Sequence, residues 1–136
     1  MKLNELYDLA DALDVDVEAF SFGAREALSV QFGPDDYLIA LDPFKLQSNA
    51  DEKTKLAHEL GHCATGAFYN ERSGCDLRER HEYRADKWAI KKLVPKDELM
   101  EAVADGHTEI YDLAERFGVT EDFMRKAAEY YMREAV

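Results

Sequence analysis

Apolar side chains follow a helical period at the start of the chain and a strand-like alternation after it. In residues 4–13, leucine and alanine fall on one helix face and acidic residues on the other. Residues 14–22 begin with alternating polar and apolar positions, which is typical of a strand or an extended connector. The apolar segments 27–32 and 37–41 flank a Gly-Pro-Asp-Asp turn, so we expect an antiparallel hairpin there.

A longer helix is expected in the middle of the chain, over residues 49–66. Ser48 or Asn49 is a suitable N-cap, and Gly66 is a typical residue just past a helix end. Glu52, three residues after Asn49, would complete a capping box. The start and the end of this helix are therefore predicted from local chemistry, without reference to any function.

Helical segments fill the rest of the chain. One starts near residue 76 and ends before Pro95, and another covers residues 97–103. Residues 110–132 have the spacing of a helix-turn-helix, with Thr120 capping its second helix. The C-terminal third of the chain is thus predicted to be helical throughout.

These elements predict an α+β fold, mostly helical, with a small antiparallel sheet of two or three strands beside the helix at 49–66. We expect one domain over residues 1–136: an N-terminal helix and sheet (1–48), two central helices (49–95) and C-terminal helices (96–136). An exposed sheet edge could bind an extended peptide as one more strand. Whether the hairpin does so, or only covers the helix, is left open because the edge strand is not defined.

The chain is acidic. Its 29 acidic and 17 basic residues give a net charge of −12, which repels nucleic-acid phosphates and favours basic partners. Residues 108–136 carry seven acids and four bases, so the helix-turn-helix pattern favours packing over DNA recognition. No apolar run is long enough for a membrane span, and the N-terminus is too acidic for a signal peptide. We expect a cytoplasmic protein.

A metal-binding pattern lies on the helix at 49–66. The sequence HELGH at residues 58–62 is an H-E-x-x-H pattern, in which both imidazoles face the same side of a helix and can reach one ion. Glu59 lies to one side, near enough to contact a water molecule on that ion. A chance match on a surface helix is disfavoured because the chain has only four histidines. Cys63 points away from the ligand face and is not expected to bind.

A second polar feature lies on the next helix. Glu82 and Asp86 are one turn apart on an otherwise small, apolar face. Zinc in a hydrolytic site takes three protein ligands and keeps a fourth position open, and two histidines with one glutamate form such a set. We therefore predict that Zn²⁺ is bound by His58, His62 and Glu82, with Asp86 hydrogen bonded to a ligating histidine.

Two alternatives remain open at this position. Glu82 could instead pair with Arg78 or Lys87 at helical spacing. His81 is a rival third ligand, although it belongs to a neighbouring helix face and has no carboxylate one turn further on.

The two motifs together resemble the ImmA/IrrE family of metallo-endopeptidases. The residues that carry the resemblance are HELGH at 58–62, E-x-x-A-D at 82–86, Trp88-Ala89, Leu93 and Pro95. The glutamate twenty positions after the second histidine is similar to the gluzincin arrangement of thermolysin-like enzymes. The resemblance covers residues 37–95 closely and extends loosely to the C-terminal helices.

This resemblance implies a minimal zincin-like fold, Zn²⁺ bound by His58, His62 and Glu82, and Glu59 as the catalytic general base. It also implies a cytoplasmic protease that cleaves a helix-turn-helix transcriptional repressor and so releases phage, mobile-element or stress-response genes. A basic DNA-binding repressor is therefore the expected partner, and neither direct nucleic-acid binding nor membrane binding is expected.

Peptide hydrolysis also needs a donor for the oxyanion that develops on the carbonyl oxygen. The candidates are His107, Tyr69, His81 and Arg84, which the sequence does not rank. Two other functions remain: a zinc-stabilised acidic module that sequesters a basic partner without cleaving it, and a DNA-binding regulator that uses residues 110–132. The acidity of the chain argues against the second.

Overall fold

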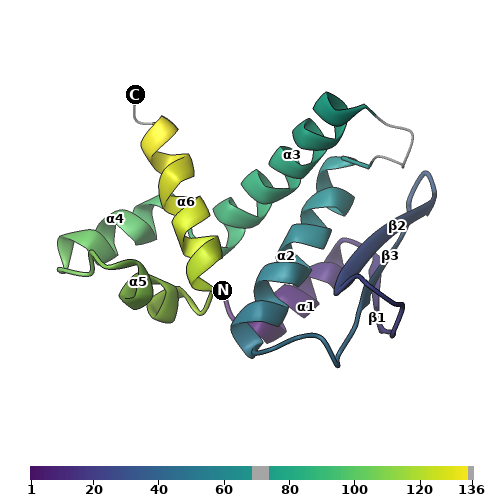
Figure 1. Ribbon diagram of the computed structural model, residues 1–136, viewed down its shortest axis with the longest axis horizontal. Helices are drawn as coiled ribbons and strands as arrows, with labels where there is room; N and C mark the ends of the chain where they lie inside the picture. The colour runs from purple at the N-terminus through teal and green to yellow at the C-terminus, as the bar shows by residue number, and fades with distance from the viewer. Residues whose placement is uncertain (69–73, 135–136) are drawn as a thin grey trace.

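The computed structural model describes residues 1–68 and 74–134, and within these ranges it contains a three-stranded sheet and six helices (Figure 1). The strands are β1 (Val15–Ala19), β2 (Ala27–Gly33) and β3 (Asp36–Leu41). The helices are α1 (Leu3–Ala12), α2 (Asn49–Thr65), α3 (Cys75–Leu93), α4 (Lys96–Ala104), α5 (Ile110–Phe117) and α6 (Glu121–Glu134). The predicted α+β class is confirmed.

The sheet has the order β1-β3-β2 and is mixed. Strands β2 and β3 form the expected antiparallel hairpin, in which Ala27 lies opposite Leu41. Strand β1 pairs in parallel with β3, with Val15 opposite Tyr37, so the prediction of a purely antiparallel sheet is wrong. The chain reverses twice between β1 and β3, and β3 rather than β2 occupies the place beside β1. Alternation of polar and apolar residues along a strand does not determine which of the other two strands pairs with β1.

The sheet and α1 pack on one side of α2, α3 packs along α2 as well, and the C-terminal helices lie on the side away from the sheet (Figure 1). Strands β2 and β3 both contact α2, and β2 is an edge strand. The side chains at the centre of the core have no exposed surface: Leu6, Ile39, Leu56, Leu60, Leu93 and Met124. Because α2 contributes to this core along its length, its direction and position are fixed by packing on both sides.

The start of α2 differs in detail from the prediction. Ser48 is the N-cap, and its hydroxyl accepts a hydrogen bond of 3.1 Å from the backbone N–H of Asp51. With Ser48 as the cap, Glu52 is one position too late for a capping box, and its carboxylate instead accepts a 2.7 Å hydrogen bond from the Tyr7 hydroxyl. Gly66 ends the helix as expected, in the left-handed conformation with φ of 67°.

The C-terminal helices are attached to the central helices by polar contacts as well as by the core. The buried ammonium of Lys53 on α2 donates a 2.7 Å hydrogen bond to the carbonyl of Phe117, the last residue of α5. The Tyr131 hydroxyl on α6 donates a 2.7 Å bond to the carbonyl of Val94, just after α3. Thr120 caps α6 as predicted, accepting a hydrogen bond from the N–H of Phe123. In the described part of the chain, no helix has the length and apolar character that a membrane span requires.

Candidate metal centre

A glycine lets the two helices of the centre approach closely. A Cβ atom built on Gly61 of α2 would lie 2.5 Å from the carbonyl oxygen of Ala85 on α3 and 2.9 Å from its Cα. Both distances are shorter than any real Cβ contact, so α2 and α3 touch backbone to backbone at this point. Gly61 directly precedes His62, and Ala85 directly precedes Asp86, so the close approach falls within the predicted site.

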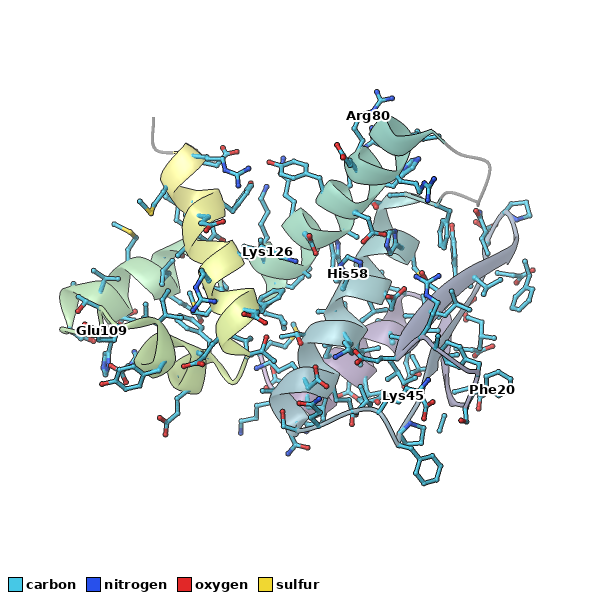
Figure 2. The ribbon with its side chains drawn as sticks, in the orientation of Figure 1. Phe20, Lys45, His58, Arg80, Glu109 and Lys126 are labelled. Atoms are coloured by element: carbon cyan, nitrogen blue, oxygen red, sulfur yellow. The ribbon has the colours of Figure 1, made fainter. Side chains whose placement is uncertain are left out.

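The three predicted metal ligands converge between these helices. Nε2 of His58 is 2.8 Å from one carboxylate oxygen of Glu82, and Nε2 of His62 is 3.1 Å from the other. The donor atoms of all three residues lie within 4.8 Å of one another, and they form the group that could hold a metal ion among the described residues. Figure 2 shows His58 between α2 and α3. Glu82 thus turns toward the histidines, as the metal-site hypothesis requires.

The other nitrogen of each histidine ring is held by a neighbour. Nδ1 of His58 is 2.7 Å from a carboxylate oxygen of Asp86, and Nδ1 of His62 bonds the backbone carbonyl of Ala67. Because both partners are hydrogen-bond acceptors, each Nδ1 carries a proton, and Nε2 is the ring nitrogen that each histidine turns toward Glu82 and would offer to a metal ion. Asp86 therefore lies where we predicted it, in contact with a candidate ligand and one turn from Glu82.

The surroundings of His58 favour positive charge. Burial is the largest effect and opposes charge on the ring, but the hydrogen bonds to Asp86 and Glu82 outweigh it and raise the pKa of His58 to about 10. Burial also opposes charge on Asp86 and by itself would raise the pKa of this carboxyl group. The hydrogen bond with His58 and the nearby ammonium of Lys126 outweigh burial, so the pKa of Asp86 is lowered. A site that stabilises a cation between carboxylates, with two imidazoles and one carboxylate as donors, fits zinc.

Glu59 lies beside this group without being part of it. Its side chain is only 8% exposed, and in the described residues no hydrogen bond or ion pair engages its carboxylate. Burying a charged group without a partner is costly, which indicates that its position serves something other than stability. Glu59 lines both of the cavities that adjoin the metal ligands.

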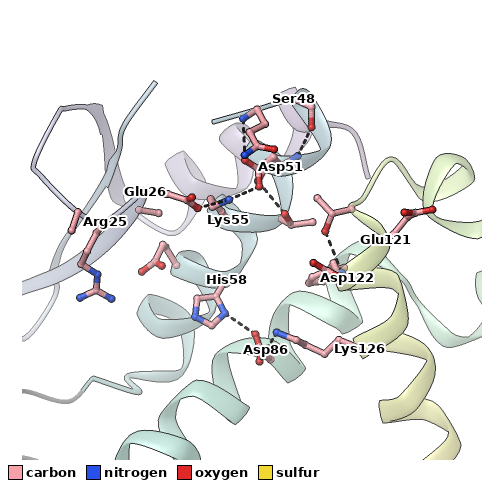
Figure 3. A pocket seen from close by; sticks show the side chains of 17 residues that line it. Arg25, Glu26, Ser48, Asp51, Lys55, His58, Asp86, Glu121, Asp122 and Lys126 are labelled. Carbon is pink, nitrogen blue, oxygen red and sulfur yellow. Dashed lines mark hydrogen bonds and ion pairs between the residues drawn. The ribbon is translucent and has the colours of Figure 1, made fainter. Parts of the chain in front are cut away.

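The larger of these cavities is an open cleft of about 760 Å³. One side is formed by the segment before β2, the floor by α2, and the other side by the start of α6 (Figure 3). Lys126 of α6 reaches into this region, where its ammonium is 3.3 Å from the second carboxylate oxygen of Asp86. The C-terminal helices therefore help to shape the site, in agreement with the packing against the metal-site helices that the sequence favours over DNA binding.

The smaller cavity, of about 60 Å³, lies directly against the candidate ligands. It is lined by Arg25, Leu28, Ser29, Glu59, His62, Phe68 and Glu82. The ring of Phe68 stacks on Tyr37 and lies against His62, which shields the histidine on that side. A small molecule or peptide group in this cavity would touch Glu59 and two of the three donor residues at once.

The remaining candidates from the sequence lie elsewhere. His81 is not part of the donor group, so the structure favours Glu82 over its rival. Of the expected oxyanion donors, His81, Arg84 and His107 line neither cavity beside the ligands, and Tyr69 is outside the described residues. His107 is instead bonded to Asp112, at 2.6 Å.

Cys63 is buried and is absent from the donor group, as expected. Burial, together with the nearby carboxylate of Glu59, raises the pKa of its thiol to about 12. The thiol is therefore protonated at neutral pH and is a poor metal ligand or nucleophile.

Comparison with known proteins agrees with this geometry. The family model of a peptidase domain described as the IrrE N-terminal-like domain matches residues 10–129, which include both central helices and most of the C-terminal helices. No curated protein and no solved structure matches the chain.

Proposed function

Because the chain belongs to the IrrE N-terminal-like domain family of peptidases, we propose that it is a zinc-dependent endopeptidase that hydrolyses a peptide bond in a protein substrate. The observation that carries this proposal is the convergence of His58, His62 and Glu82 beside a buried Glu59 whose carboxylate has no bonded partner in the described chain. An ion-binding site that served stability alone would have no use for such a group.

The residues fit zinc in number and in kind. His58, His62 and Glu82 would bind the ion, while Asp86 and the carbonyl of Ala67 hold the two rings in the required tautomer. Bound zinc supplies a Lewis acid that polarises a substrate carbonyl and lowers the pKa of water. With three protein donors, such a site keeps room for a reactant, whereas a purely structural site is closed by four.

Glu59 would act as the general base and then as the general acid. Its carboxylate faces the small cavity, where a water molecule and the substrate carbonyl would meet. Glu59 takes a proton from that water as the oxygen attacks the carbonyl carbon, and it passes the proton to the leaving amine when the C–N bond breaks. The second proton of the water, left on the new carboxyl group, also goes to the amine. The products are a carboxylate and an ammonium group, and Glu59 is again deprotonated.

A protein substrate would enter as an extended segment. The cleft is open, and β2 is an edge strand beside α2, so main-chain hydrogen bonds to β2 could hold the segment over Glu59. The chain's net charge of −12 favours a basic substrate. A helix-turn-helix repressor, whose DNA-binding surface is basic, suits these properties and is the substrate we propose.

The direct test is to incubate the zinc-loaded protein with the helix-turn-helix repressor encoded beside its gene and to measure the fragment masses. We expect one or a few defined cuts, complete loss of cutting after zinc removal by a chelator, and recovery when zinc is restored. Stable association with both proteins intact would instead support the acidic binding module. Cleavage that continues at full rate after complete zinc removal would contradict the proposal.

A further inference from the structure

The two cavities beside the metal ligands share one cationic side chain. Arg25, just before β2, lines both the small cavity and the large cleft, and the small cavity also exposes Glu59, His62 and Glu82. We propose that Arg25 is a catalytic residue whose guanidinium donates a hydrogen bond to the substrate carbonyl oxygen as negative charge develops there. This assignment rests on the proposed peptidase function.

Arg25 is the cation of the cleft that remains available to a substrate. Lys55 is engaged twice, by Glu26 at 2.6 Å and by Asp51. Lys126 is engaged by Asp86 at 3.3 Å. In the described chain no ion pair holds the guanidinium of Arg25, and the residue is exposed. Its five N–H donors can therefore reach an incoming carbonyl without breaking an existing ion pair.

The backbone around Arg25 is held in place although its side chain is exposed. The Arg25 carbonyl accepts a 3.3 Å hydrogen bond from Lys45 Nζ, and the Glu26 carbonyl accepts a 2.9 Å bond from the N–H of Asp42. The ion pair of Glu26 with Lys55 ties the same segment to α2. Figure 3 shows the consequence: Arg25 lies on one side of His58, and Asp86 with Lys126 lies on the other. Such anchoring fixes the backbone position of Arg25, from which its side chain lines both cavities.

The chemistry of peptide hydrolysis gives this position a use. When water adds to the carbonyl carbon, the C=O π electrons move to oxygen, and Glu59 takes the proton that the water loses. A cation aimed at that oxygen stabilises the transition state more than the neutral substrate. When the C–N bond breaks, the carbonyl re-forms, the proton goes to the amine, and the charge at Arg25 is no longer needed. A purely structural arginine beside Glu59 and Glu82 would instead act on zinc affinity or stability.

The experiment compares zinc-loaded wild type, Arg25→Ala and Arg25→Lys on a pool of synthetic peptides, with products identified by mass spectrometry. Removing one oxyanion donor costs about 10²-fold or more in kcat, so we expect that loss in Arg25→Ala, with the zinc Kd and Tm unchanged. Arg25→Lys should lie between the two, because it keeps the charge but not the planar fork. Guanidinium ion added to Arg25→Ala should restore part of the rate. Arg125→Ala, which removes an exposed arginine of α6 that lines neither cavity, should match wild type.

A second measurement needs no turnover. A phosphinic analogue of the best-cleaved peptide, whose tetrahedral oxygen copies the oxyanion, should bind Arg25→Ala about 10²-fold more weakly than wild type. The uncleaved peptide should bind equally to Glu59→Gln with and without the Arg25 change. If wild type cleaves and Arg25→Ala keeps its kcat, or if the loss follows zinc affinity, the assignment of Arg25 is wrong while the proposed function stands. If zinc-loaded wild type cleaves no peptide in the pool, the proposed function falls and the assignment falls with it.

Discussion

Replacing Glu59 by glutamine is expected to abolish peptide cleavage and to leave zinc binding intact. Glutamine keeps the size and the polar character of the side chain but cannot take a proton from water. General base catalysis contributes about 10²–10⁴-fold, and Glu59 would serve twice in the cycle, so we expect kcat to fall by about 10³-fold or more. Zinc should stay because Glu59 is not one of the three converging donors.

The measurement is zinc content per chain together with cleavage of the repressor or of a peptide. Glu52→Gln is the matched control on the same helix: its oxygen only accepts a hydrogen bond from Tyr7, and an amide oxygen can do the same. It should keep both zinc and activity. Equal cleavage by wild type and Glu59→Gln would remove the peptidase mechanism proposed for this site.

Replacing Gly61 by alanine should damage the metal centre without touching a ligand. The added Cβ would meet the Ala85 carbonyl oxygen at 2.5 Å, and backbone atoms on both sides leave no flexible group that could yield. Helices α2 and α3 must therefore separate by nearly 1 Å, roughly the misplacement that costs a site about 10²-fold. We expect zinc affinity to fall at least about 10-fold and stability to fall by about 1–3 kcal/mol.

Zinc titration and thermal unfolding of the metal-free protein measure these two effects. Gly74→Ala is the control, because a Cβ there meets no described atom within 4 Å and the φ of −63° suits alanine. Its zinc affinity should not change, and its loss of stability should stay below about 1 kcal/mol. A Gly61→Ala protein with wild-type zinc affinity would show that the close approach of α2 and α3 does not set the ligand geometry.

The ligand positions could be predicted because they depend on local geometry. Four residues make about one helical turn, so His58 and His62 share a face once residues 49–65 are helical. Glu82 and Asp86 follow the same rule on α3, which is why one contacts the histidine Nε2 atoms and the other a histidine Nδ1. The helix boundaries were predicted from caps such as Gly66, which are also local.

Features set by distant packing could not be predicted. The place of β3 between β1 and β2 depends on which edges meet in the folded chain, and alternation along each strand is the same for either order. The sequence offers both Ser48 and Asn49 as the N-cap, and the folded chain shows that Ser48 is the one used. Arg25 belongs to no motif and lies 33 residues before His58, so only the folded cleft reveals it.

The binding of one zinc ion by His58, His62 and Glu82 is tested most directly by zinc titration of Glu82→Ala beside wild type and His81→Ala. We predict one tightly bound zinc per chain in wild type and in His81→Ala. In Glu82→Ala the affinity should be lower by about 10²-fold or more, because losing a ligand costs at least as much as losing one of its supporting partners. Wild-type affinity in Glu82→Ala, together with zinc loss in His81→Ala, would contradict this assignment of the metal centre.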